Sequence, residues 1–259
     1  MSTRERPYHQ IGNQILAAIS PDEYERLSPH FEQVELPHGQ VLIASEEPIQ
    51  FVYFPDGALI SQVTQLSDGS TVEAAVAGRE GIAGLPVIWG ADSTPMQSVV
   101  QIPGTAIKVR TKVIRDAFAR GGALQFRILR YAHTLFIAVS QNAACNAQHR
   151  IEARLARWLL TSSDAVECDE MPLTQEFIAT MMGVRRAGVA CASLILREQG
   201  LVNYKGGNIR IINRVGLETI ACECYRVIKE QLNLLTNNGD RQVPLTLKRT
   251  DSDKGANDV

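Results

Sequence analysis

The chain has 259 residues, with 26 lysines and arginines against 28 aspartates and glutamates, so its net charge at neutral pH is −2. This length allows one large domain or two ordinary ones, each with its own core. A content of 45% hydrophobic and 21% charged residues is typical of a globular protein. The slightly acidic balance excludes a surface that binds phosphate everywhere, so any nucleic-acid interface must be local.

The chain contains no apolar run long enough to span a bilayer, and Met1–Pro7 lacks the apolar core of a signal peptide. Its five cysteines are odd in number and all lie in the second half, which favours a reducing compartment. We therefore expect a cytoplasmic protein without a membrane partner.

Short strands separated by turn residues fill the first half of the chain. Pro55-Asp56-Gly57 and Ser67-Asp68-Gly69 are examples of the turns. The strands and turns predict an antiparallel sandwich, barrel or roll over residues 1–110, preceded by a short helix at Pro21–Ser28. The expected strands are Glu32–Leu36, Gln40–Ala44, Phe51–Phe54, Ala58–Gln65, Thr71–Val76, Ser98–Ile102 and Thr105–Val109.

Helical patterns follow from residue 111 to 148. Thr111 can cap a helical turn, Lys112–Ala119, and a long helix is expected at Ala123–Gln148. On this helix apolar positions recur every 3.5 residues, as in a coiled-coil seam, and a polar Asn142 suits a position that fixes register. The alternative is a helix packed on its own domain. We expect dimerisation through Leu124, Ile128, Tyr131, Leu135, Ala138 and Asn142.

The remainder divides into a small helical domain over residues 149–225 and a C-terminal part, 226–259. A helix is expected at Arg150–Thr161 and a polar connecting loop at Ser162–Glu170. The C-terminal part reads as the end of a helix followed, from about Asn233, by a flexible tail without periodicity.

The stretch Leu173–Ile212 predicts a winged helix-turn-helix. Thr174 can cap a short helix, Gln175–Met182, and Gly183 suits the turn before a second helix, Arg185–Gln199. Two arginines, Arg185 and Arg186, begin that second helix, and the N-terminal end of a recognition helix is the end that enters the major groove. After it, two short apolar runs flank a Lys-Gly-Gly turn that contains Lys205, which predicts the wing hairpin.

At Arg150–Asn213 the sequence resembles the cyclic-AMP receptor/fumarate-nitrate regulator (Crp/Fnr) family, and the similarity extends over about Gln14–Tyr225. The motif that carries it is "RIEARLARWLL…LTQEFIATMMGVRRAGVACASLILREQGLV". The resemblance implies an α+β fold: an N-terminal antiparallel β-roll (a cyclic-nucleotide-binding-like jelly roll), a long dimerisation helix and a C-terminal winged helix-turn-helix. It also implies a homodimer on double-stranded DNA with a two-fold operator. RNA polymerase is a further candidate partner.

The resemblance also suggests individual DNA contacts. Gln175 falls where the family contacts the DNA backbone, and Arg186 falls on a base-reading arginine. Ala187 and Cys191 replace two further base-reading side chains, so the family's best-known operator is not expected. The full expected set is Thr174, Gln175, Arg185, Arg186, Ala187, Gly188, Ala190, Cys191 and Lys205.

In the sensor half, the family's cyclic-nucleotide site is degenerate. Gly84 replaces the family's Glu for the ribose, and Gln97 stands where its Arg should hold the phosphate. A buried phosphate without that charge-assisted partner loses about 1.5–3 kcal/mol. We expect the degenerate pocket, Gly84, Leu85, Gln97 and Ser98, to take an effector other than cyclic AMP or none.

No catalytic constellation, cofactor or metal site is expected. Cys222 and Cys224 form a C-x-C pair without a second Cys or His pair at metal spacing, so a ligand role is not predicted. Cys191, beside arginines, is a hypothetical redox switch. The sequence therefore predicts a homodimeric, sequence-specific transcription regulator. The alternative is a ligand-sensing or adaptor protein whose winged helix binds another protein.

Overall fold

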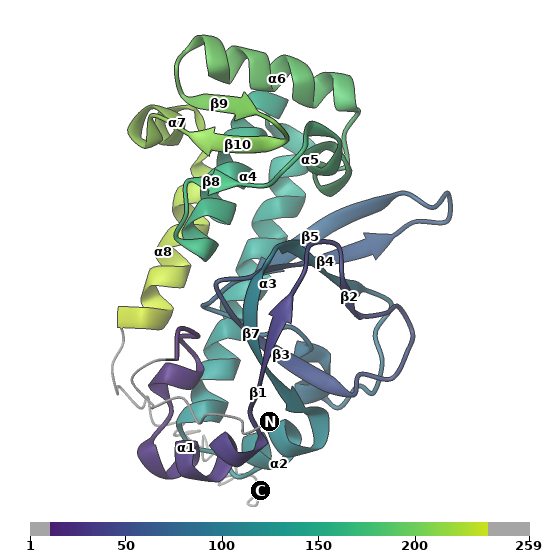
Figure 1. Cartoon of the computed structure of the whole chain (residues 1–259), viewed down its shortest axis with the longest axis vertical. Helices are drawn as coiled ribbons and strands as arrows, with labels where there is room; N and C mark the ends of the chain where they lie inside the picture. Colours follow the sequence, from purple (N-terminus) through teal and green to yellow (C-terminus); the bar gives the residue numbers. More distant parts are fainter. Residues whose placement is uncertain (1–10, 238–259) are drawn as a thin grey trace, which may run out of the picture.

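The computed structural model describes residues 11–237, and its N-terminal half is a β-roll made of two antiparallel sheets (Figure 1). One sheet has the strand order β1-β7-β3 and the other β2-β6-β4-β5. All seven expected strands are present within two residues of their predicted ends, which confirms the antiparallel roll. Their bounds are β1 Glu32–Leu36, β2 Val41–Ile43, β3 Phe51–Asp56, β4 Leu59–Gln65, β5 Thr71–Ala77, β6 Gln97–Ile102 and β7 Gly104–Arg110.

The hairpin of β4 and β5 projects from the side of the roll, and β5 packs beside α5 of the C-terminal domain (Figure 1). Its turn depends on Gly69, which has φ +83°, a backbone conformation that costs glycine little. The Ser70 N–H donates to Asp68 Oδ1 at 2.9 Å, and the Leu66 N–H donates to Ser70 O at 2.8 Å. These bonds close the turn and fix the strand register.

Three α-helices belong to the N-terminal half: α1 at Pro21–Leu27, α2 at Thr111–Ala119 and α3 at Ala123–Gln148. Ser20 and Glu23 form a reciprocal capping box at the start of α1. Thr111 is the first residue of α2 and not its cap, because its hydroxyl donates to Ile49 O at 2.6 Å. Among residues 11–110 the structure also has the short 3₁₀ turns η2 at Leu16–Ala18, η3 at Ser28–His30 and η4 at Leu85–Trp89.

The C-terminal half contains the expected helices and hairpin together with two helices that continue beyond them. Its elements are α4 Ile151–Val166, β8 Glu170–Met171, α5 Gln175–Met182, α6 Arg186–Glu198, β9 Val202–Lys205, β10 Asn208–Ile211, α7 Arg214–Ile220 and α8 Glu223–Asn237. The prediction of a loop from Ser162 is wrong at its start, because α4 continues to Val166. Ser162 and Ser163 are buried there, and Ser162 Oγ accepts a hydrogen bond from Gln101. Polar residues on a buried helical face resemble a loop in the sequence.

Helix α8 runs back along α3 (Figure 1). Arg127 Nη1 donates to Leu235 O at 2.7 Å, and Arg130 Nη2 donates to Leu234 O at 2.9 Å. The expectation of a flexible tail from Asn233 is therefore wrong up to residue 237. The rest of the expected tail, 238–259, and the N-terminal segment Met1–Pro7 lie outside the described residues.

The two halves share one apolar cluster. Leu59, Val63 and Ile102 of the roll belong to the same core as Leu155 and Leu159 of α4. In the part of the chain that the structure describes, no single helix has the length and composition to cross a membrane. Only α5 and α6 taken together, bent by 114°, meet that test.

The seam assigned to dimerisation faces the inside of the chain. Leu124, Ile128 and Tyr131 are almost completely buried in the same core as the β-roll. Leu135 and Ala138 are half-buried, and Asn142 Nδ2 donates to Ala74 O of β5 at 2.9 Å. The burial of Leu124, Ile128 and Tyr131 within their own chain contradicts their assignment to a subunit interface, because a heptad pattern predicts an apolar face and does not identify what packs on it. For the half-buried Leu135, Ala138 and Asn142 the assignment stays a prediction.

Candidate nucleic-acid interface

The turn between α5 and α6 is built as the sequence predicts. Thr174 caps α5, accepting a hydrogen bond from the Phe177 N–H at 3.1 Å. Gly183 ends α5 in the left-handed region with φ +62°, the usual C-terminal role of glycine. Its N–H donates to Thr180 O at 3.1 Å, so the turn satisfies its own backbone groups.

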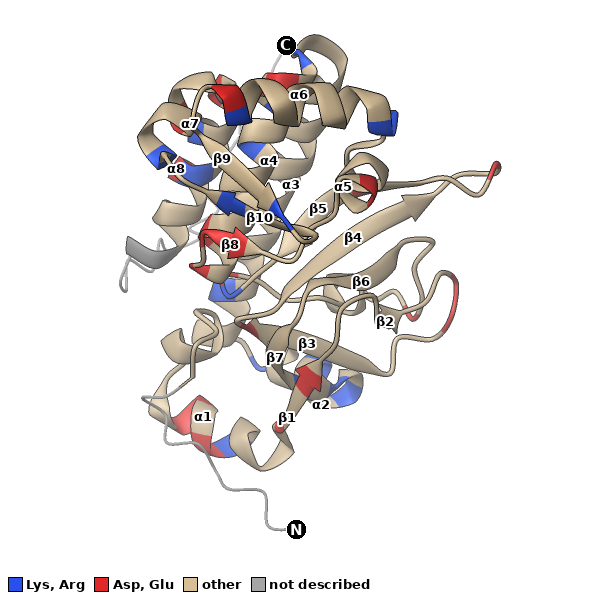
Figure 2. Cartoon of the chain, turned by 45° about the horizontal axis from the view of Figure 1, so that its top comes forward, with Lys and Arg blue, Asp and Glu red and all other residues tan. Residues whose placement is uncertain are grey.

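Helix α6 presents one apolar face to the domain core and one polar end to the exterior. Val189, Ala192 and Leu196 are fully buried, at helical spacing. Arg185, which is the N-cap residue, and Arg186 are exposed where the helix begins. Figure 2 shows this end of α6 as a basic segment at the edge of the domain. The free N–H groups of the first turn add partial positive charge at the same place.

The outward face of α6 is narrower than expected. Ala187 and Cys191 are exposed, as predicted, but Gly188 and Ala190 are half-buried. A Cβ atom added at Gly188 would lie 2.9 Å from Cδ1 of Ile151 in α4. Gly188 therefore serves the close packing of α6 on α4, and a DNA contact at Gly188 stays a prediction.

Arg186 has a partner that the sequence did not reveal. Its Nε lies 3.3 Å from Glu176 Oε2, and both side chains are about two-thirds exposed. Exposed ion pairs of this kind contribute between about 0 and 1 kcal/mol. The pair links α5 to α6. Because the interaction is weak, the Arg186 guanidinium can exchange the Glu176 carboxylate for another acceptor. Gln175, next to Glu176, is half-buried at the first turn of α5.

The wing is a tight hairpin with a lysine at its tip. Lys205 is paired with Asn208 across a two-residue turn in which Gly206 and Gly207 have φ +61° and +85°. Positive φ at both turn positions requires glycine or a similar residue. Strand β8 adds to β10, which makes the wing the edge of a three-stranded sheet. Lys205 is exposed, as a phosphate contact must be.

The helix-turn-helix rests on the β-roll of its own chain. A Cβ atom at Gly183 would lie 3.0 Å from Val72 Cγ2 in β5. The rings of His38 and Phe177 meet edge to face with their centroids 5.2 Å apart. The turn of the helix-turn-helix therefore packs directly on the β-roll.

The residues predicted to form a degenerate nucleotide site pack into the roll. Gly84 has φ +99°, and a Cβ atom there would lie 3.0 Å from Val52 Cγ1. Leu85 is 1% exposed, and Ser98 is also buried. Gln97 lies at the start of β6 and is half-buried. Gly84 itself offers no carboxylate, and its neighbour Leu85 is a core side chain.

A separate cavity of about 490 Å³ lies between β5, α3, α4 and α8. Gly84, Leu85, Gln97 and Ser98 are not among its lining residues. Buried polar groups usually have hydrogen-bond partners. Four buried atoms that line this cavity have none among the described residues: Tyr131 Oη, Asn142 Oδ1, Arg157 Nε and Thr161 Oγ1.

Glu73 of β5 is a buried carboxyl on the wall of this cavity. Trp158 Nε1 donates to it at 2.8 Å, and the Ser61 hydroxyl lies 2.6 Å away. Burial raises the pKa of Glu73 to about 7, although the bonds from Ser61 and Trp158 and the charge of Arg157 act against that rise. The Ser61 hydroxyl is also 2.6 Å from Gln101 Oε1 and has only one proton to give. A protonated Glu73 satisfies both contacts by donating to Ser61.

A helix-turn-helix with an exposed arginine end and a Gly-tipped wing defines the class of winged-helix DNA-binding domains. Residues 153–220 match the family model described as the Crp-like helix-turn-helix domain. No curated protein sequence matches the chain. Similar solved structures include FixK2 from Bradyrhizobium japonicum, 17% identical with a TM-score of 0.63, the match covering 74% of this chain and 98% of that one.

Two further structures show the same fold. A CRP-family transcriptional regulator from Thermus thermophilus is 16% identical with a TM-score of 0.62, covering 73% of this chain and 96% of that one. The c-di-GMP responsive global regulator CLP from Xanthomonas campestris is 14% identical with a TM-score of 0.61, covering 74% and 99%. The resemblance to the Crp/Fnr family is confirmed: the chain carries a Crp-like DNA-binding domain within the Crp/Fnr regulator fold. The function that the matched domain supports is DNA binding.

Proposed function

We propose that the chain binds a two-fold DNA operator as a homodimer, with α6 in the major groove. The observation that carries the proposal is the orientation of α6. Its buried face holds it to the domain, and its N-terminal end leaves Arg185 and Arg186 exposed. Arginine there can donate two hydrogen bonds to guanine O6 and N7, which is the commonest specific base contact.

The surroundings of α6 supply phosphate contacts. Lys205 at the wing tip and the first-turn residue Gln175 lie outside the helix, where the DNA backbone borders the groove. Thr174 keeps its hydroxyl on the backbone of α5 and acts as a cap. The overall charge of −2 is compatible with this local interface, because only the face around α6 needs to be basic.

A dimer interface fits the exposed face of α3 better than the buried one. Leu129, Phe136 and Val139 are 48%, 71% and 39% exposed. Leu129 and Phe136 are one heptad apart, and Val139 follows at a spacing of three, so they form a stripe along the helix. Exposed apolar stripes of this kind mark protein interfaces. We propose that the same stripe of a second copy covers it, which would set two α6 helices at the spacing of operator half-sites.

An effector would occupy the 490 Å³ cavity, and not the degenerate nucleotide site. The cavity volume is in the range of small-molecule sites. The polar atoms of Tyr131, Asn142, Arg157 and Thr161 that have no hydrogen-bond partner favour a polar ligand. Native mass spectrometry of the purified chain, before and after denaturation, identifies a retained ligand. An Asn142→Leu variant that retains the same ligand equally well would contradict this location.

The test of DNA binding is selection of operator sequences from random DNA, followed by titration of Arg186→Ala. This variant should lose about 1–3 kcal/mol of operator affinity and lose base preference at one position per half-site. The matched control is Arg197→Ala, an exposed arginine in the last turn of the same helix. Affinity should fall linearly with salt on logarithmic axes.

Enrichment of no DNA motif would overturn the proposal and would favour the alternative, an adaptor whose winged helix binds a protein. Equal losses for Arg186→Ala and Arg197→Ala would leave DNA binding intact but refute the orientation of α6.

A further inference from the structure

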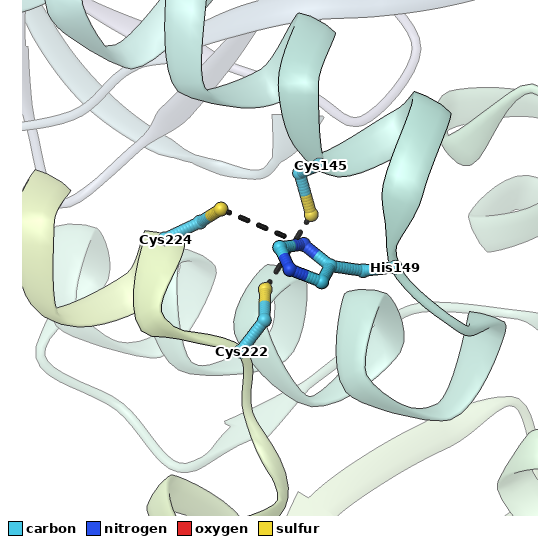
Figure 3. A group of neighbouring side chains, drawn as sticks. All are labelled: Cys145, His149, Cys222 and Cys224. Atoms are coloured by element: carbon cyan, nitrogen blue, oxygen red, sulfur yellow. Dashed lines mark hydrogen bonds between the residues drawn. The ribbon is translucent and has the colours of Figure 1, made fainter.

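Three cysteines and one histidine meet where α3 ends and α8 begins (Figure 3). The ligand atoms of Cys145, His149, Cys222 and Cys224 all lie within 4.8 Å of one another. Cys145 Sγ is 3.5 Å from Cys222 Sγ, and Cys224 Sγ is 3.7 Å from His149 Nδ1. The three cysteines are buried and the histidine is half-buried.

Local structure explains how the four side chains come together. Cys145 and His149 are four residues apart at the end of α3, so they share one face of the helix. Cys222 precedes α8 and Cys224 lies in its first turn. Because α8 runs back along α3, the C-x-C pair reaches a partner pair 77 residues earlier. The sequence expectation that Cys222 and Cys224 have no such partner is therefore wrong.

The separations fit a single tetrahedral ion. With Zn–S near 2.3 Å and Zn–N near 2.05 Å, a tetrahedral site has sulfur–sulfur edges of about 3.8 Å and sulfur–nitrogen edges of about 3.6 Å. An iron–sulfur cluster would spread its ligands over several iron atoms and needs wider separations than 4.8 Å allows. We propose that Cys145, His149, Cys222 and Cys224 bind one zinc ion, in the Cys₃His arrangement of structural zinc sites.

The second nitrogen of His149 already has the partner that zinc-binding histidines use. Glu223 Oε1 lies 3.2 Å from His149 Nε2, while Nδ1 faces the sulfur atoms. A carboxylate on the outer nitrogen fixes the ring orientation and leaves the inner nitrogen free to bind metal. Glu223 thus acts as a positioning residue.

Buried positive charge next to the cluster suits an anionic metal centre. Arg154 and Arg157 of α4 are 8% and 5% exposed, and both interact electrostatically with Cys145. Among the described residues neither forms an ion pair with a carboxylate, and the Nε atom of each has no hydrogen-bond partner. Three thiolates around a doubly charged ion leave one net negative charge, which offsets one of the two positive charges of Arg154 and Arg157.

The position of the site gives the metal a mechanical role. Only His149 and Arg150 separate α3 from α4, the first helix of the DNA-binding domain. An ion bound to both α3 and α8 would fix the angle at this link, since α8 follows directly from the same domain. The inference does not depend on DNA binding, because metal binding is measured on the protein alone.

The experiment is metal analysis of the full chain purified under reducing conditions. We expect elemental mass spectrometry to find one zinc ion per chain. Reagents that block thiols should release this zinc. Replacement by cobalt should give the intense visible bands of a tetrahedral thiolate site. Cys145→Ser and Cys222→Ser should lose both signals, whereas Cys168→Ser, an exposed cysteine outside the cluster, should keep them.

A separate variant tests the positioning role. Glu223→Gln should keep the stoichiometry and lower zinc affinity by about tenfold or more. A folded chain with free thiols that binds neither zinc nor cobalt would overturn the proposal. So would an iron–sulfur spectrum, or a Cys145–Cys222 disulfide in protein isolated without metal. These outcomes are all measured on the wild-type chain, so the result does not depend on whether a variant folds.

Discussion

Glu73 should make the stability of the protein depend on pH in a direction opposite to that of most carboxylates. Its pKa rises from an ordinary 4.5 to about 7 because the carboxyl is buried against β4, β6 and α4. A raised pKa means that the folded state binds the proton more tightly than the unfolded chain does. The stabilisation is therefore complete below pH 4.5 and is lost as the pH rises through 7.

The shift of this pKa corresponds to about 3 kcal/mol of unfolding free energy, at about 1.4 kcal/mol for each tenfold change in equilibrium constant. Glu73→Gln removes the titration and keeps the shape. Its amide can donate to Ser61 while its oxygen accepts from Trp158 Nε1, which reproduces the bonds of the protonated acid. The variant should match the wild type at about pH 4 and exceed it by about 3 kcal/mol near pH 8.

The measurement is urea unfolding of both proteins at a series of pH values and one fixed protein concentration, followed by tryptophan fluorescence. The difference between the two free energies isolates Glu73 from other groups, including Glu80, whose pKa burial also raises. A difference that stays constant between about pH 5 and about pH 8 would refute the reasoning.

Three further substitutions test other parts of the structure. Phe136→Glu should convert a dimer to monomers in analytical ultracentrifugation; an unchanged mass would exclude this face of α3 as the interface. Gly183→Ala should lower the unfolding free energy by about 1–2 kcal/mol, because φ is +62° and Val72 leaves no room; an equal or higher urea midpoint would contradict this. Glu176→Gln frees Arg186 and removes a negative charge near DNA, so operator affinity should rise severalfold in a binding titration, and a fall would count against the interface.

Much of the fold could be predicted because the relevant signals are local. The strands of the roll are bounded by Gly and Pro turns, and Gly183 between two helical patterns marks the turn of the motif. The buried face of α6 follows from helical spacing alone. These features depend on residues within a few positions of one another.

The errors concern contacts between distant segments. The seam on α3 is apolar, but only the packed structure shows that its own β-roll covers it and that Phe136 faces outward. The cluster of Cys145, His149, Cys222 and Cys224 was not predicted for the same reason. Its two pairs approach each other only because α8 runs back along α3. A search for any Cys-x₃-His paired with any Cys-x-Cys would have found it.

The contact between the motif turn and the β-roll limits how the protein can be divided. Val72 and His38 of the roll fill space beside Gly183 and Phe177, and Leu59 shares a core with α4. A helix-turn-helix cut from this chain, or grafted onto another sensor, would expose those surfaces. We therefore expect the two halves to unfold together, and we expect substitutions at Val72 in β5 to disturb the turn of the helix-turn-helix.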